Sequence, residues 1–262
     1  MPRFGGQVLG NCVALSQICG LLGERHAPET KGMFGNGGNV GLNGHHFPID
    51  HGIILSSGNI TNAIGSNSFS TAGTAFYPGE GDPDLDNLVN SSTTDAAVLE
   101  FNLTPTNAFT LMFQYVFASE EYPEYIGPFN DPMAIFVSTN RVGTNWGNNI
   151  TNDIALVPGL TNRVAVSVNT INGGYVDVAD PTNPQYYVDN ADPNYQAATN
   201  TAAIPIYNLQ YDGFTTLLTA QTNLSAHITY HVKIGIADYG GKTDDHTYDS
   251  AIFIKTQTFP CQ

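Results

Sequence analysis

Basic side chains are scarce in this chain, which has 8 Lys and Arg against 23 Asp and Glu and a formal net charge of −15 at pH 7. So acidic a protein is a poor partner for nucleic acid or an anionic membrane surface, and we expect neither. No Lys or Arg occurs between Lys31 and Arg141, while ten acidic residues lie from Glu80 to Asp131. Repulsion among these acids destabilises the fold unless cations are bound, so the pattern favours calcium over a solvated acidic face.

Long apolar runs and cysteines are also few. A run of about 18 apolar residues, the length that spans a bilayer, is absent, so we predict no membrane span. The start of the chain makes a poor secretory signal, so we expect either a signal removed before residue 1 or another export route. The three cysteines, Cys12, Cys19 and Cys261, lack the spacing of a zinc site. They allow one disulfide with one thiol left over, or a bond from Cys261 to a neighbouring chain.

Helical patterns are rare as well. Apolar residues at helical spacing predict one short helix over 8–23, followed by a loop-like stretch to about residue 46. Beyond it, apolar and polar residues alternate as in half-buried antiparallel strands. The strands are predicted at 51–56, 95–103, 109–118, 132–138, 153–157, 163–169, 204–208, 213–221, 228–237 and 248–258. We therefore predict an all-β, jelly-roll-like antiparallel β-sandwich over 46–262 with long acidic loops, preceded by an N-terminal helix and arm over 1–45.

The most informative stretch is LMFQYVFASEEYPEYIGPFNDPMAIFVS, residues 111–138. Two apolar runs, which we predict to be adjacent strands, bracket an acidic loop that contains Pro and Gly. The loop carries the oxygen donors Glu120, Glu121, Glu124, Asn130 and Asp131. Oxygen donors suit calcium, which takes about six to eight oxygen ligands. The stretch therefore predicts a sandwich whose loops are held by bound metal.

This stretch closely resembles the central motif of the choice-of-anchor L domain, which occurs in secreted and surface proteins of prokaryotes. Further blocks are similar to the same family in the same order: IDHGIILSSGNITNAIG (49–65), GEGDPDLDNLV (79–89), TDAAVLEFNLTP (94–105), NDIALVPG (152–159), VSVNTIN (166–172), YYVDN (186–190), YDGFTTLLTA (211–220) and YHVKIGIADYGGKTDDHTYDSAIFI (230–254). The resemblance covers about residues 46–254 and is weaker before them. It implies an extracellular or cell-surface domain, and it implies little about activity.

Candidate metal ligands occur in several of these blocks. In GEGDPDLDNL three aspartates stand at every second position, and in an extended loop their side chains would point to one side. An EF-hand is rejected because the required Gly and the final Glu are missing, while a cluster of Asx turns stays open as the alternative. The predicted ligands, for an undetermined number of calcium ions, are Asp82, Asp84, Asp86, Glu120, Glu121, Asn130, Asp131, Asp189, Asp245 and Asp249.

No catalytic constellation stands out from the sequence. Neither a GxSxG nor an HExxH motif is present. Glu120 and Glu121 are sequence neighbours, and adjacent side chains at the end of a strand diverge, whereas glycoside hydrolysis needs two carboxyl groups that face each other. We therefore expect a protein that is not an enzyme, and a secreted hydrolase is the least favoured of the functions considered.

Two non-enzymatic functions fit the sequence. The first is an extracellular structural protein, a calcium-stabilised subunit that assembles with itself into a surface filament or sheath. No anchor follows the domain, so such a subunit would be held by its neighbours, by strand addition through the arm 1–45. The alternative is a monomeric adhesin or carbohydrate-binding module. In that case Trp146, Tyr186 and Tyr187 would contact surface glycans, because aromatic rings stack on sugars.

Overall fold

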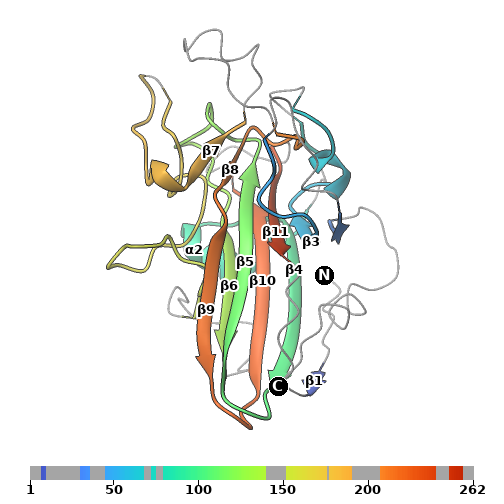
Figure 1. The fold of residues 1–262 in the computed structure, drawn as a ribbon. Helices are drawn as coiled ribbons and strands as arrows, with labels where there is room; N and C mark the ends of the chain where they lie inside the picture. Colours follow the sequence, from blue (N-terminus) through green and yellow to red (C-terminus); the bar gives the residue numbers. More distant parts are fainter. Residues whose placement is uncertain are drawn as a thin grey trace.

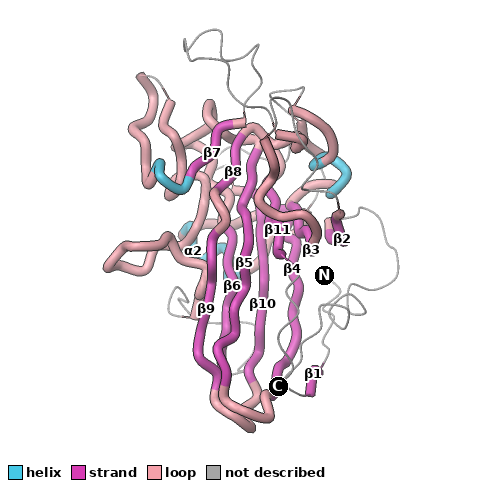
Figure 2. The backbone as a smooth tube through the Cα atoms, viewed as in Figure 1, coloured by secondary structure: helices cyan, strands magenta, loops and turns pink. Residues whose placement is uncertain are grey.

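The computed structural model describes residues 7–9, 30–35, 45–67, 72–74, 79–139, 152–175, 177–190, 207–239 and 248–255. In these parts, long and mainly antiparallel strands form two sheets that pack face to face (Figure 1). Two single-turn 3-10 helices, η2 (Ile60–Ala63) and η4 (Pro184–Tyr186), lie with long loops at one end of the strands, which we call the loop end (Figure 2). The predicted all-β antiparallel sandwich is confirmed.

The smaller sheet has four strands in the order β1-β4-β10-β6. Their bounds are Gln7–Leu9 for β1, Thr94–Thr104 for β4, Tyr230–Asp238 for β10 and Met133–Ser138 for β6. β10 runs antiparallel to both of its neighbours, whereas β1 is parallel to β4. In this register Lys233, in the middle of β10, lies between Glu100 of β4 and Phe136 of β6.

The larger sheet has seven strands, with the order β2-β3-β11-β5-β8-β7 and β9 as a second partner of β5. Their bounds are Lys31–Phe34 for β2, Gly52–Ser56 for β3, Ser250–Lys255 for β11, Phe109–Ser119 for β5, Gly213–Thr215 for β8, Tyr187–Asp189 for β7 and Leu218–Leu224 for β9. β8 pairs with Ala118 and Ser119 at the end of β5, and β9 pairs with Phe109–Tyr115 of the same strand. All these pairs are antiparallel, so the C-terminal end of β5 and the N-terminal ends of β8 and β11 meet at the loop end.

The main core lies between the two sheets. In β4 every second residue from Asp95 to Leu103 is buried, as expected for a strand with one face against a core. The inward side chains of β4 and β10 pack against those of β5 and β11, with Phe101, Phe117, Ile234 and Ile252 among them.

Both sheets also carry apolar clusters on their outer faces. On the larger sheet, Phe214 and Phe253 pack with Phe47 and Tyr211, which come from the loops. On the smaller sheet, the helix α2 (Pro83–Val89) places Leu85 against Phe136 and its neighbours. Neither sheet therefore leaves its outer face wholly to solvent, and the smaller sheet is covered where β10 contains Lys233.

Several local predictions differ from the structure. Residues 153–157 and 163–169 form only isolated bridges, because the Asp153 carboxylate accepts the N–H groups of Ile135 and Ala155 that a regular ladder would use. The predicted strand 213–221 is divided into β8 and β9, and α2 lies in a stretch predicted as a loop. In the N-terminal part, residues 8 and 9 of the predicted helix belong to β1, and the rest of that helix lies outside the described residues. β2 lies in the predicted loop before residue 46.

No helix in the described parts of the chain combines the length and the apolar character needed to cross a membrane.

Candidate functional site

Carboxylates gather where four strands of the larger sheet reach the loop end. Ser119 of β5 pairs with Ser250 of β11 and with Gly213 of β8, and Gly213 pairs in turn with Asp189 of β7. These residues form one row across the sheet, and their chain neighbours Glu120, Asp212 and Asp249 follow directly beyond it. We call Glu120, Glu124, Asp189, Asp212 and Asp249 the loop-end carboxylate cluster.

Glu120 is an almost completely enclosed member of the cluster. The residue is 1% exposed, and its Oε2 accepts a hydrogen bond of 3.3 Å from the backbone N–H of Ala72. Its Oε1 has no hydrogen-bond partner among the described residues. Burial, followed by the charge of Asp212, raises the pKa of the Glu120 carboxyl to about 10, and Asp249 and Glu124 add to the rise. A carboxyl group in this position either keeps its proton or binds a cation.

Asp212 and Asp249 are held in place by amide side chains. The Asn67 amide donates to Asp212 Oδ1 at 2.5 Å and to the carbonyl of Asn190 at 2.8 Å. The Asn62 amide donates to Asp249 Oδ2 at 2.9 Å. Gly58 packs so closely on the Asp249 carboxylate that an added Cβ would lie 1.7 Å from Oδ2. The loops that approach this end of the sheet are therefore shaped around these two carboxylates.

Glu124 and Asp189 complete the cluster on the β7 side, next to Tyr187. Burial raises the pKa of the Glu124 carboxyl to about 7; a backbone hydrogen bond opposes this rise, and the charge of Asp189 adds to it. Burial, with Asp189 as the second cause, also raises the pKa of the Tyr187 hydroxyl. These shifts have one origin: several acidic groups share a small volume with little water.

Glu121, Asn130 and Asp131 have a different surrounding from the cluster. Glu121 Oε2 accepts from the Ser119 hydroxyl at 3.3 Å and from the N–H of Asp131 at 3.4 Å. Asp131 Oδ1 accepts from the N–H of Tyr239 at 2.8 Å, and Asn130 Oδ1 accepts from the N–H of Asn169 at 2.9 Å. These contacts join the end of β5 to the end of β10, so all three side chains organise the loop between the two sheets.

The three aspartates of GEGDPDLDNL do not lie in an extended loop, and that prediction is wrong. Asp82 caps the N-terminus of α2: its Oδ1 accepts from the N–H groups of Asp84 at 3.0 Å and Leu85 at 3.3 Å. Asp86 turns away and accepts from the hydroxyl and the N–H of Thr93. An N-cap Asp followed by Pro83 is a helix-start signal in the sequence, and it decides the local structure here.

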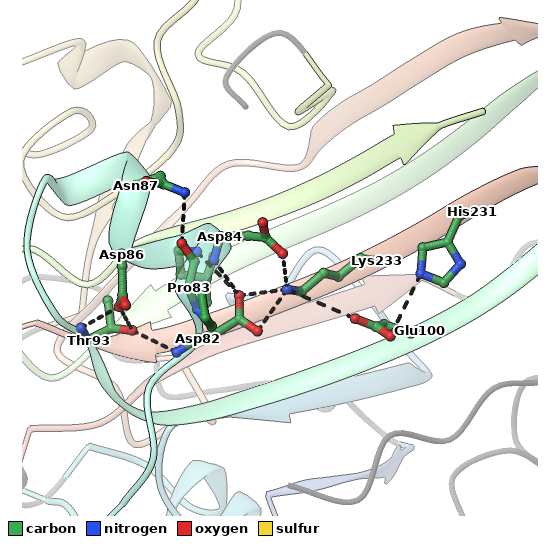
Figure 3. A network of polar contacts seen from close by, with 10 residues as sticks. Asp82, Pro83, Asp84, Asp86, Asn87, Thr93, Glu100, His231 and Lys233 are labelled. Carbon is green, nitrogen blue, oxygen red and sulfur yellow. Dashed lines mark hydrogen bonds and ion pairs between the residues drawn. The ribbon is translucent and has the colours of Figure 1, made fainter. Parts of the chain in front are cut away.

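Asp82 and Asp84 face the ammonium group of Lys233, not the loop-end carboxylate cluster (Figure 3). Lys233 Nζ lies 2.6 Å from Asp82 Oδ1 and 2.5 Å from Asp84 Oδ2. Glu100 Oε1 is 4.0 Å from the same nitrogen. The Lys233 side chain is 1% exposed, so this is a buried ion-pair network. The cation that these aspartates face is a side chain from β10.

Among the described residues, no group of three or more His, Cys, Asp or Glu side chains is arranged to hold a metal ion. Of the predicted ligands, the structure brings Glu120, Asp189 and Asp249 into one cluster and keeps Asp82, Asp84 and Asp86 apart from it. Asp245 lies outside the described residues. Asp212 and Lys233 were not among the predicted site residues; a charged Lys within the apolar run of β10 was the available signal for Lys233.

The comparisons with known proteins agree with the resemblance found in the sequence. The family model described as the Choice-of-anchor L domain matches residues 6–260. This chain belongs to the choice-of-anchor L family. No curated protein and no solved structure gives a significant match to it.

Membership in the choice-of-anchor L family makes this a surface-associated or secreted protein. The match is wider than the predicted span of 46–254 and includes most of the segment 1–45. β2, from that segment, is a strand of the larger sheet. The part in assembly that we predicted for 1–45 stays a prediction.

The aromatic residues of the alternative function have packing partners. The Tyr187 ring lies 5.0 Å from the Tyr122 ring, measured between centroids, and leaves no room for side chains at Gly173 and Gly213. The Tyr186 hydroxyl donates to the carbonyl of Pro158 at 3.3 Å. Both tyrosines therefore support the β7 loop of this choice-of-anchor L domain, and Trp146 lies outside the described residues. A contact of these residues with glycans stays a prediction.

Proposed function

We propose that this choice-of-anchor L protein is a non-enzymatic structural subunit of the cell surface, stabilised by calcium at the loop-end carboxylate cluster and assembled with copies of itself. The observation that carries the proposal is the environment of Glu120. This side chain is fully enclosed, has an unsatisfied oxygen, and faces Asp212, Asp249 and Glu124. Burying a carboxylate among others is unfavourable unless a cation compensates it.

Calcium fits this position better than a proton does. A proton neutralises one carboxylate, whereas a divalent cation compensates two, and the cluster has five. Calcium accepts carboxylate, amide, backbone and water oxygens in flexible geometry, so two of these carboxylates need only supply part of the shell. The loop end also offers the backbone carbonyls of Asn190 and Asp249, which lie beside the cluster.

Assembly is supported by the exposed edge of the larger sheet. Within the described residues β9 pairs with β5 alone, and its sequence LTAQTNL contains neither a charged residue nor Pro. Edge strands that must not associate usually carry Lys, Pro or a bulge. An uncharged seven-residue edge is a suitable surface for adding a strand from a neighbouring copy.

The proposal is tested by negative-stain electron microscopy of the purified protein in calcium and after chelation. We expect ordered filaments or sheets in calcium that loosen when it is removed. A variant with Thr219→Lys and Gln221→Lys, which charges two exposed positions on β9, should fail to assemble. The control is Thr161→Lys with Asn162→Lys, which adds the same charge at exposed positions of a loop.

The two parts of the proposal fail separately. Dispersed particles for the unaltered protein at every calcium concentration would rule out self-assembly. Polymers that the β9 variant forms as well as the control would exclude β9 as the contact. The calcium site is tested by unfolding measurements with calcium and after chelation, whose result does not depend on assembly.

A further inference from the structure

The network around Lys233 has the composition of a reactive site as well as of an ion pair. Lys233 lies in the middle of β10, opposite Glu100 and Phe136, and the beginning of α2 covers it. An amine and carboxylates are thus brought together in a place from which water is excluded (Figure 3). A low-dielectric site of this kind favours reactions that remove charge.

The amine lies next to one particular carboxyl carbon. Lys233 Nζ is 2.6 Å from Asp82 Oδ1 and 2.7 Å from Asp82 Oδ2. Because both oxygens are this close, the carbon that joins them lies about 3 Å from the nitrogen, within the range for reacting atoms, and a rotation of the carboxyl group about its Cβ–Cγ bond is needed to turn the face of this carbon toward Nζ. Asp84 contacts Nζ through one oxygen only, at 2.5 Å, and so lies in the position of a proton acceptor.

We propose that Lys233 and Asp82 form an intramolecular isopeptide bond. In the reaction a proton passes from the Lys233 ammonium to the Asp82 carboxylate, which leaves a neutral amine and a carboxylic acid. Nζ then attacks the Asp82 carboxyl carbon, and Asp84 takes a second proton from the nitrogen. Asp84 gives this proton to Asp82 Oδ2, the bond between the carbon and Oδ2 breaks, and one water molecule leaves. The ammonium and the carboxylate become an amide and water, with no net change of charge and no oxidant.

The groups around Asp82 suit this reaction. While Nζ is attached and Oδ2 has not yet left, negative charge develops on Oδ1, which already accepts from the N–H groups of Asp84 and Leu85. Donors aimed at the oxygen that gains charge lower the barrier of acyl transfer. Oδ1 keeps these two bonds as the amide carbonyl, so the cap of α2 is preserved in the product. Glu100, at 4.0 Å from Nζ, is the nearest further carboxylate and can accept from the amide N–H.

The bond would fasten the beginning of α2 to β10, two segments that are 151 positions apart in the chain. It would form whether or not the protein binds calcium or polymerises, because it needs only the folded sandwich. Unlike a disulfide it would persist under reducing conditions. For a protein exposed at the cell surface, this links the smaller sheet to its covering helix covalently.

The first test is the mass of the purified full chain. We expect a mass below that of the sequence by one water molecule, in denaturant as well as in buffer. Digestion of the denatured protein with trypsin gives a second, local measurement. Trypsin cleaves after Lys233 only when its amine is free, so the peptide IGIADYGGK (234–242) should be missing. In its place a branched peptide should link Lys233 to Asp82.

Three variants separate the isopeptide bond from a simple ion pair. The Lys233→Met variant should have the full mass of its own sequence. The Lys255→Met variant, changed at the end of β11, should still have a mass lower by one water molecule. Asp84→Asn keeps both reacting groups and should slow or abolish the loss. Full mass together with a free 234–242 peptide in the unaltered chain would overturn the proposal, even if Lys233→Met does not fold. Fragmentation that places the link on Asp84 would overturn the assignment to Asp82.

Discussion

Two groups of buried carboxylates lie on different sheets of this sandwich, and they differ in what faces them. On the smaller sheet, Asp82 and Asp84 face the ammonium group of Lys233. On the larger sheet, Glu120 faces Asp212, Asp249 and Glu124, which raise its pKa further after burial has already done so. The first group carries its cation in the chain. The second group creates a need for a cation from solution, and this contrast underlies both proposals.

The contrast also shows why acidic residues alone are weak evidence for a metal site. Asp82, Asp84 and Asp86 have the more suggestive spacing in the sequence, yet two of them pair with a Lys 149 and 151 positions away and the third caps a turn. Asp212 and Asp249 lie in separate parts of the sequence and are brought together by strand pairing. Which group a carboxylate contacts in the fold depends on the register of the paired strands, not on how many acidic residues are near it in the sequence.

The largest effect is expected from Lys233→Met. This change leaves Asp82 and Asp84 buried as carboxylates, without either the cation or the isopeptide bond that Lys233 supplies, and breaking a buried pair in this way costs about 3–5 kcal/mol of unfolding free energy. Urea unfolding measures it, with Lys255→Met as the control. Adding Asp82→Asn and Asp84→Asn to Lys233→Met should recover part of the loss, since no buried charge is then left. A loss below about 1 kcal/mol, as for an exposed pair, would contradict the buried network.

An intermediate effect is expected at the loop-end carboxylate cluster. Calcium at 100 times its dissociation constant should raise the free energy of unfolding by about 2.7 kcal/mol, and chelation should remove this gain. Glu120→Gln should show little response to either treatment, because the enclosed charge is gone. Asp177→Asn, an exposed acid outside the cluster, should respond like the unaltered protein. A melting temperature that chelation leaves unchanged would reject calcium.

The smallest effect, counted per pH unit, is expected from a change of pH at Asp153, whose carboxylate is bound by backbone N–H groups. Two backbone N–H groups bind its Oδ1, while burial raises the pKa of the carboxyl from 3.8 to about 7. The folded state therefore keeps a proton that the unfolded chain releases. This group's contribution to stability falls as pH rises from about 4 to about 7, by no more than about 1.4 kcal/mol per pH unit, and is constant above.

Asp153→Asn isolates this contribution, because all other groups titrate equally in both proteins. The difference in unfolding free energy between the variant and the unaltered protein should shift in favour of the variant between pH 4 and 7. Parallel stability curves across this range would show that Asp153 is ionised in the folded state at low pH, like an exposed carboxylate.

Alternation of apolar and polar residues, together with short apolar runs, predicted most long strands. β4, β5, β6, β10 and β11 all overlap predicted ranges; β4 alternates because one of its faces packs on the core, whereas β6 and β11 are nearly continuous apolar runs buried on both faces. The start of α2 was also present in the sequence, as an N-cap Asp followed by Pro83, but the spacing of the aspartates suggested an extended loop. The runs 153–157 and 163–169 are as apolar as strands, and a single carboxylate that binds the N–H groups prevented a ladder.

The sequence by itself determined the all-β class, the family and the acidic character, because each depends on residue types and local periods. Only the tertiary structure decided which charges meet. Lys233 reaches Asp82 because β10 lies between β4 and β6 under α2, and Glu120 reaches Asp249 because Ser119 pairs with Ser250. Such contacts join residues more than a hundred positions apart. They are set by strand register, and a shift of one residue would turn each of these side chains to the other face.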